Sequence, residues 1–137
     1  MNLFRQNAIL QAARGLIGQT YASLDCSHFV HEAYEEAGYP YPYHNSVHFG
    51  ELAGDRNAPF LSVPATGQKE GGDVIVMFGH MGIWDPQGCT ILTNNPECSR
   101  LGGNAPFLSS RKGGNRGPDF GRTQWWNGNY TIYRWID

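Results

Sequence analysis

Apolar residues recur at helical spacing in two stretches near the start of the chain. Over residues 2–17 they fall three or four positions apart, and glycines mark the end of the run. Over residues 26–37 the pattern is stronger, because the apolar side chains share one face and Gly38 stands at the C-terminal stop position. Asp25 comes directly before this run, and its carboxylate can accept from the free amides of a first helical turn. We therefore predict two helices, the second of them capped by Asp25.

Strand patterns follow in the second half of the chain. Residues 74–78 form a β-branched apolar run that is typical of a buried strand, and residues 81–84 and 90–93 predict two more strands joined by a turn at 85–88. These three would form an antiparallel meander. Residues 130–136 alternate in strand fashion and are expected to close the sheet. Helices followed by a meandering sheet predict an α+β fold.

The segments between these elements are predicted to be less regular. Pro40 and Pro42 break the chain after the second helix, residues 44–52 are compatible with a short helix, and a loop is expected over residues 57–64. Residues 101–128 are rich in glycine and polar residues and lack helical or strand periodicity. We expect them to form a long surface excursion, held on the body of the protein by its aromatic side chains.

Composition bounds the size of the fold and its partners. The chain has 137 residues, 40% hydrophobic and 16% charged, so it can bury one sizeable core and is predicted to be a single domain over residues 1–137. Its net charge of -2 comes without a basic run, which argues against a nucleic-acid partner. No segment is apolar for long enough to predict a membrane span. Arg5 and Arg14 also interrupt the opening apolar pattern, unlike the core of a signal peptide.

Cys26 is the cysteine whose position suggests chemistry. It opens the second predicted helix, where free amides and the helix dipole favour the nucleophilic thiolate. The alternative is a buried structural cysteine, but Asp25 and Ser27 flank Cys26 at the capped end of the helix, away from its apolar face, so we favour the nucleophile. Three cysteines are an odd number; Cys89 and Cys98 are able to pair across a loop, and their spacing alone leaves that pairing open.

A thiol nucleophile needs a base that takes and returns a proton near neutral pH, and imidazole suits this role. His80 is the best placed of the five histidines, because it follows a buried strand at Gly79 and opens the next strand, which would hold its ring rigidly. In the absence of Cys26, a histidine in a hairpin turn would be the simpler interpretation. The remaining histidines are expected to be solvated, to pack on a neighbour or to line a groove: His28, His31, His44 and His48.

Two segments resemble the signature motifs of NlpC-type cell-wall hydrolases. They read DCSHFV at residues 25–30 and GDVIVMFGHMGIW at residues 72–84. Tyr21 ahead of the cysteine and the Gly-Tyr-Pro sequence at residues 38–40 after its helix are also similar to that family. The resemblance covers residues 2–95, about two thirds of the chain.

This resemblance implies a papain-like fold that cleaves amide bonds in the peptide stems of peptidoglycan. By the same resemblance, Cys26 would attack the carbonyl carbon and His80 would carry the proton. The backbone amide of Cys26 would help to bind the oxyanion. Tyr21, Asp25 and Ser27 would lie near the thiol, the oxyanion or the bound substrate. No cofactor and no metal ion are expected.

The sequence departs from the family pattern in three places. Only three residues separate Tyr21 from Asp25, where the family often has a glycine-rich insertion, and His28 stands where glycine is frequent. The strand after the base usually carries a histidine, or another polar residue, as third member of the triad, and residues 90–95 contain no histidine. Asn94 is predicted to orient the imidazole through its amide oxygen; the equal alternative is that Asn94 belongs to a turn.

Three other functions stay open from the sequence. Cys26 and the histidines other than His80 are zinc-ligand types, although a zinc-bound Cys26 would not be a nucleophile. A non-catalytic module that binds carbohydrate or protein is a second alternative, although both Cys26 and His80 are retained. The third is a hydrolase that uses the same pair on a lipid or on a protein glutamine.

A wall hydrolase without an export signal is expected to be delivered by dedicated machinery. We expect a secreted antibacterial effector, acting as a toxin, or a phage-associated lysin. Either would reach the periplasm or cell wall of a bacterium without a classical signal peptide. Its partners would be the peptidoglycan peptide stems and, in the producing cell, an inhibitor (immunity) protein that blocks the groove.

Overall fold

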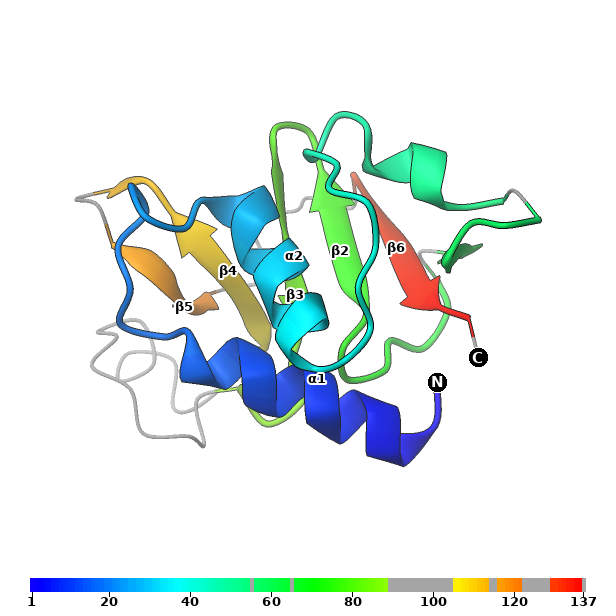
Figure 1. Ribbon diagram of the computed structural model, residues 1–137, viewed down its shortest axis with the longest axis horizontal. Coiled ribbons are helices and arrows are strands. Elements are labelled where there is room, and N and C mark those ends of the chain that lie inside the picture. Colours follow the sequence, from blue (N-terminus) through cyan, green and yellow to red (C-terminus); the bar gives the residue numbers. More distant parts are fainter. Residues whose placement is uncertain (55, 65, 89–104, 114–115, 122–128, 137) are drawn as a thin grey trace.

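The computed structural model describes residues 1–54, 56–64, 66–88, 105–113, 116–121 and 129–136. Within these ranges, two α-helices and a short 3-10 helix accompany one six-stranded antiparallel sheet, so the predicted α+β class is confirmed (Figure 1). The elements are α1 (Leu3–Gly15), α2 (Cys26–Glu36), η1 (Phe49–Leu52), β1 (Phe60–Val63), β2 (Val74–Met77), β3 (His80–Trp84), β4 (Phe107–Arg111), β5 (Gly117–Gly121) and β6 (Tyr130–Trp135). The strands lie in the order β1-β6-β2-β3-β4-β5.

Side-chain caps explain where both helices begin. Asn2 Oδ1 accepts from the Arg5 amide at 2.8 Å, and Asp25 Oδ1 accepts from the His28 amide at 2.9 Å. Each contact satisfies an amide that the first turn leaves free. Both predicted helices and the Asp25 cap are confirmed, while the short helix expected after the prolines is a single 3-10 turn, η1. No helix in the described part of the chain combines the length and apolarity needed to cross a bilayer.

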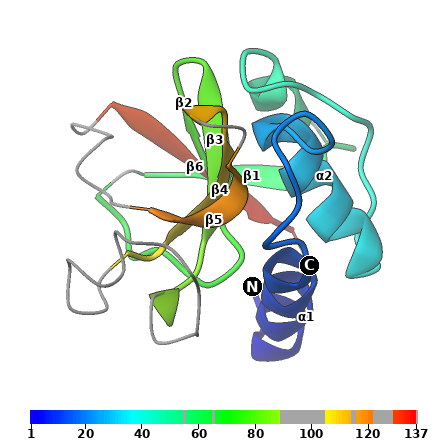
Figure 2. The same ribbon diagram turned by 90° about the vertical axis from the view of Figure 1, so that its left-hand side faces the viewer.

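Both helices pack on the same face of the sheet (Figure 2). The buried face of α2 joins one apolar cluster with Val74 of β2, Met81 of β3 and Leu108 of β4. Ile75, the residue after Val74, belongs to a second cluster with Phe107 and Ile132. Because successive strand residues point to opposite faces, this second cluster lies on the face away from the helices.

Two buried carboxylates tie helix α1 and strand β6 to the ends of β3 and β2. Asp85, directly after β3, accepts from Nε and Nη2 of Arg14 on α1, each at 2.8 Å. Asp73, directly before β2, accepts from Nε and Nη2 of Arg134 on β6 at 2.9 and 2.8 Å. Both carboxylates are fully buried, so these bidentate pairs fix the end of β3 and the start of β2.

The prediction of a surface excursion over residues 101–128 is wrong where the structure describes this segment. It contains β4 and β5, and most of their residues are buried. Several of their buried positions are small or polar, as at Ser109, Ser110 and Gly117, and interrupt the large apolar residues Phe107, Leu108 and Phe120. A Cβ atom on Gly117 would lie 1.8 Å from the Gln19 carbonyl oxygen, so the close approach of the chain selects small residues and removes the alternating pattern.

The order of strands also differs from the prediction. The strand hydrogen-bonded to β3 on the side away from β2 is β4, and the strand predicted over residues 90–93 lies outside the described residues. β6 does not lie at an edge, because it pairs with both β1 and β2. β1 itself falls within the expected loop; Pro59 and Pro64 bracket it, which an edge strand tolerates. The pairing of Cys89 with Cys98 also concerns residues outside the described ranges.

Candidate active site

Cys26 is the first residue of α2, and its side chain is nearly enclosed, with 9% of the residue exposed. Burial raises the pKa of the Cys26 thiol, and the charge of Asp25 adds to the rise. The backbone amides of Met81, Ser27 and Cys26 itself lower this pKa, because they donate toward the sulfur. The expectation of a favoured thiolate is therefore wrong for this structure, where burial outweighs the helix terminus and leaves a neutral thiol at neutral pH.

His80 opens β3 directly after a tight turn. Met77 and His80 are register partners, and the turn between them consists of Phe78 and Gly79, with Gly79 at φ 73°. The turn therefore needs glycine at its second position, since a side chain is strained at that φ. Burial lowers the pKa of His80 to about 4, and the positive charge of Arg111 contributes. The imidazole is thus neutral at pH 7 and available as a base.

The ring of His80 is held by two residues of β4. Its Nε2 atom is hydrogen-bonded to Ser109 Oγ at 3.1 Å, and its ring meets the Phe107 ring edge-on, with centroids 5.8 Å apart. Ser109 is fully buried. The sequence interpretation missed Ser109, because a serine in a glycine-rich stretch without periodicity carries no strand signal. The predicted orienting residue, Asn94, lies outside the described residues.

Cys26 and His80 lie on opposite sides of β3, because the His80 ring packs on Phe107 on the face away from the helices and Cys26 begins α2 on the helix-covered face. α2 begins at the end of the sheet where β2 turns into β3 (Figure 1). The Met81 amide that points at the Cys26 sulfur follows His80 directly in the chain. Among the described residues, however, the His80 ring is hydrogen-bonded to Ser109, and no hydrogen bond joins it to the sulfur. The strand therefore separates the two groups, and they are not in contact.

The three other predicted site residues lie around the start of α2. Tyr21 is half-buried, and its pKa is raised by burial and by the charges of Cys26 and Asp25, which places the phenol within electrostatic range of the thiol. Ser27 Oγ donates to Asp25 Oδ1 at 3.2 Å and is hydrogen-bonded to the Tyr43 hydroxyl at 2.6 Å. Asp25 and Ser27 therefore hold the helix start and the Tyr43 segment together.

Burial acts to raise the pKa of the Asp25 carboxyl, yet the pKa lies below its ordinary value. Hydrogen bonds from the His28 amide, the His28 ring and Ser27 hold it down. The His28 ring lies 2.7 Å from Asp25 Oδ1 through Nδ1 and stacks on Tyr43, with ring centroids 4.3 Å apart. Asp25 is thus an ionised, partly exposed carboxylate directly beside Cys26.

The remaining histidines bond within their own surroundings. As predicted for the helix histidines, His28 and His31 pack on neighbours, since His31 Nε2 is hydrogen-bonded to the Tyr41 carbonyl at 3.0 Å. His44 Nδ1 lies 2.8 Å from the Pro42 carbonyl. No group of three or more histidine, cysteine, aspartate or glutamate side chains within the described ranges is arranged to hold a metal ion.

The turn that leads into Cys26 is held by β4 and β5. Ser110 Oγ donates to the Leu24 carbonyl, and the Leu24 amide donates to the Thr20 carbonyl at 3.0 Å. The Gln19 carbonyl lies directly against Gly117 of β5. The segment that sequence analysis assigned to a surface excursion therefore fixes the turn that carries Tyr21.

Comparison of the chain with protein-family models and with curated proteins found no match. The resemblance to NlpC-type hydrolases therefore rests on the sequence motifs, chiefly those at residues 25–30 and 72–84.

Proposed function

We propose that this chain is a papain-like cysteine hydrolase of the NlpC type that cleaves an amide bond in peptidoglycan stem peptides through an acyl-enzyme on Cys26. The observation that carries the proposal is the convergence at Cys26. Three backbone amides point at its sulfur, and one of them belongs to Met81, the residue after His80. Donors arranged in this way stabilise negative charge that develops at the start of the helix.

Both reacting groups are neutral at rest, which defines the first step. The pKa of the Cys26 thiol is raised and that of His80 is lowered to about 4, so no thiolate-imidazolium pair exists before substrate binds. His80 therefore takes the thiol proton as the sulfur attacks the carbonyl carbon, and the carbonyl oxygen becomes the oxyanion. The Cys26 amide is a donor for that oxyanion.

The later steps return the proton and release both products. The carbon–nitrogen bond breaks as the imidazolium gives its proton to the leaving nitrogen, and a thioester remains on Cys26. Water then attacks the thioester carbonyl while His80 takes a proton from it. The carbon–sulfur bond breaks, the sulfur regains a proton, and a carboxylic acid leaves. The cycle requires that Ser109 Oγ accepts a hydrogen bond from the protonated Nε2 of His80. Nδ1 then carries the lone pair that takes the proton.

The imidazole must move before it can act on the thiol. A general base works within about 2.6–3.2 Å of the proton that it takes, or through one water, and such contacts often tighten only when substrate binds. Closure of the gap between His80 and Cys26 is therefore a requirement of the proposal. His80 projects from β3 to the face away from the helices, so rotation of the ring alone does not meet that requirement, and the residues around His80 must rearrange when substrate binds.

Digestion of purified peptidoglycan tests the proposal directly. We expect the wild-type chain to release new muropeptides, identified by mass, and both Cys26→Ala and His80→Ala to release none. His48→Ala is the matched control, because His48 is an exposed histidine paired with Glu51 at 3.2 Å, and it is expected to retain wild-type cleavage. An unchanged muropeptide profile with the folded wild-type chain would contradict the proposal.

The proposed delivery of the enzyme has its own test. As an antibacterial effector or phage-associated lysin, the chain acts on the wall from the periplasm, and a producing cell holds an inhibitor protein. Expression with an added export signal is expected to lyse a bacterial host, whereas cytoplasmic expression and exported Cys26→Ala are not. Equal lysis by all three would show that toxicity does not come from wall cleavage.

A further inference from the structure

A row of side chains leads away from His80 across the sheet. Tyr130 of β6 pairs with Met77 of β2, Met77 pairs with His80 of β3, and His80 is hydrogen-bonded to Ser109 of β4. Residues that pair directly in antiparallel strands project to the same face. The row therefore connects the proposed base with the β2–β6 side of the sheet, on the face away from the helices.

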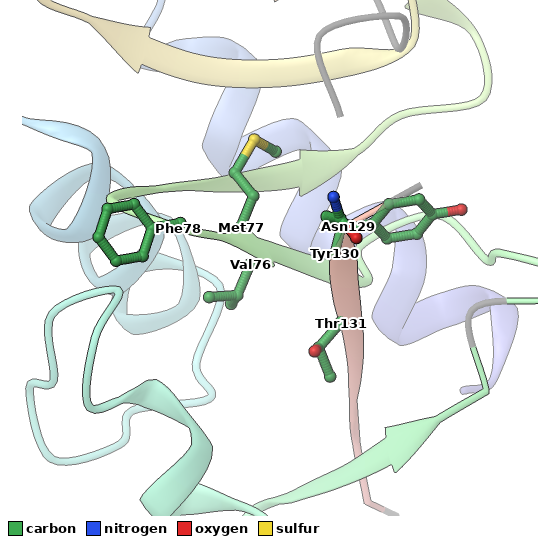
Figure 3. Close-up of a pocket in the computed structure, with 6 residues that line it drawn as sticks. All are labelled: Val76, Met77, Phe78, Asn129, Tyr130 and Thr131. Atoms are coloured by element: carbon green, nitrogen blue, oxygen red, sulfur yellow. The ribbon is translucent and has the colours of Figure 1, made fainter. Parts of the chain in front are cut away.

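A cavity of about 510 Å³, wide open to solvent, lies at this end of β2 and β6 (Figure 3). Its size is within the range of small-molecule sites, roughly 300–1,000 Å³. Figure 3 shows Phe78 and Tyr130 at opposite ends of the lining, with the other side chains between them. The residues that line the cavity are Val76, Met77, Phe78, Asn129, Tyr130 and Thr131.

The chemistry of this lining favours an uncharged ligand. None of the six side chains carries a charge, and the hydrogen-bonding groups are the amide of Asn129 and the hydroxyls of Tyr130 and Thr131. The nearest cation that the contacts reveal, Lys69, is already engaged, since its Nζ lies 5.1 Å from the centroids of both the Tyr130 and the Trp84 rings. Apolar surface with a few neutral polar groups is typical of a site that recognises shape and hydroxyl or amide groups.

Phe78 is the most informative residue of the cavity. Its ring is fully exposed, at 102% of the reference area, although a phenylalanine gains about 1.5–3 kcal/mol from burial. The fold does not need this side chain, because the turn depends on Gly79 and on the pairing of Met77 with His80. An unused aromatic ring one residue from that turn glycine is well suited to stack on a ligand.

We propose that this cavity is a subsite for an N-acetylated sugar residue of the peptidoglycan glycan strand. The apolar face of a pyranose ring stacks on an aromatic ring, and the hydroxyl and acetamido groups of such a sugar match the neutral donors and acceptors of Asn129 and Tyr130. The choice of a cell-wall sugar rests on the proposed function. The subsite includes Met77, the register partner of His80, so the glycan would be held next to the proposed base.

Binding of a chitin tetramer to the inactive full chain tests the subsite without hydrolysis. Titration calorimetry with Cys26→Ala is expected to give saturable binding. Addition of Phe78→Ala is expected to weaken the binding roughly tenfold, which equals about 1.4 kcal/mol, and Phe78→Trp is expected to retain it. Phe4→Ala is the matched control, because Phe4 is an exposed phenylalanine on α1, 79% accessible and outside the cavity.

Each outcome bears on either the subsite or the proposed function. Absence of binding to the tetramer, or binding that Phe78→Ala leaves unchanged, would overturn the sugar subsite even if stem peptides are cleaved. Binding of a free stem peptide that depends on Phe78, without binding of the tetramer, would reassign the cavity to peptide and overturn the sugar. Sugar binding that depends on Phe78, in a wild-type chain that cleaves no wall substrate, would defeat the proposed function and leave the subsite standing.

Discussion

Ser109 Oγ lies 3.1 Å from His80 Nε2 at the centre of the sheet, and this contact joins β4 to the proposed base. The serine is fully buried, so it competes with no solvent for the ring. A neutral hydroxyl fixes the orientation of the imidazole without adding a charge. We therefore assign Ser109 as a positioning residue, which acts through His80 and not on the substrate.

Removal of the Ser109 hydroxyl is expected to lower kcat with little change in KM. In Ser109→Ala the ring loses the partner that selects its tautomer. Partners that orient metal-bound histidines contribute about 10- to 100-fold, and we expect a loss of that order here. Ser109→Thr, which keeps the hydroxyl, is the control that should recover activity if the strand accepts the extra methyl group. Nitrogen NMR of the His80 ring in Ser109→Ala should report less of the Nε2-protonated tautomer. An unchanged tautomer with unchanged kcat would contradict the positioning role.

The activity is expected to persist to unusually low pH. With a pKa of about 4, His80 stays neutral and able to accept a proton well below the ordinary range of histidine. The acidic limb of the kcat/KM profile, which reports groups of the free enzyme, is therefore expected near pH 4 and not near pH 6.5. An acidic limb between pH 6 and 7 would mean that the imidazole is solvated in the working enzyme.

Alkylation of Cys26 is expected to be slow at neutral pH. Burial raises the pKa of this thiol, so little thiolate is present to react. In a chain with Cys89→Ser and Cys98→Ser, the iodoacetamide rate should keep rising above about pH 8.5, the ordinary pKa of a free cysteine. Mutation of His80 should leave that profile nearly unchanged, since the two groups share no hydrogen bond in the described structure. Fast labelling at pH 7 would indicate a preformed thiolate instead.

Protonation of His80 also opposes folding. The folded pKa of about 4 lies below the unfolded value of about 6.5, so the unfolded chain binds the extra proton between these values. The free energy of unfolding should therefore fall as the pH drops from 6.5 to 4, by on the order of 2–3 kcal/mol from this group. Urea unfolding of the wild-type chain and of His80→Gln at pH 7 and pH 4.5 isolates the effect of His80, because the carboxyl groups titrate in both chains. Parallel losses in the two chains would exclude this contribution from His80.

The parts that sequence analysis predicted correctly depend on local patterns. α2 is readable because its apolar face, its Asp25 cap and the following Gly38 all lie within one short segment. β2 and β3 are readable because their apolar runs are buried strands that flank a turn. These features need no knowledge of distant contacts.

The parts that it missed depend on contacts between distant segments. β4 and β5 contain serine and glycine at inward positions because the turn before α2 lies against them, as the Ser110 contact with Leu24 and the Gly117 contact with Gln19 show. No local pattern encodes that approach. The contact of Ser109 with His80 was missed for the same reason, because it depends on which strand lies beside β3.

Gly117 offers the sharpest test of this arrangement. Its φ of 74° disfavours any side chain, and a Cβ atom there would meet the Gln19 carbonyl oxygen at 1.8 Å. Gly117→Ala must therefore displace backbone as well as adopt a strained conformation, and we expect it to reduce the free energy of unfolding by about 2 kcal/mol or more. Because the displaced turn carries Tyr21, kcat/KM should fall even at a temperature where the variant stays folded.

Gly113→Ala is the matched control for this prediction. A Cβ atom on Gly113 would meet nothing within 4 Å, so the same substitution there should change the melting temperature by little. Thermal unfolding of both variants, together with muropeptide release below the lower transition, separates stability from positioning. Suppose that Gly117→Ala lowered stability but left cleavage at the wild-type rate. β5 would then support the fold without positioning the turn that carries Tyr21. The assignment of Tyr21 to the site would lose its structural basis.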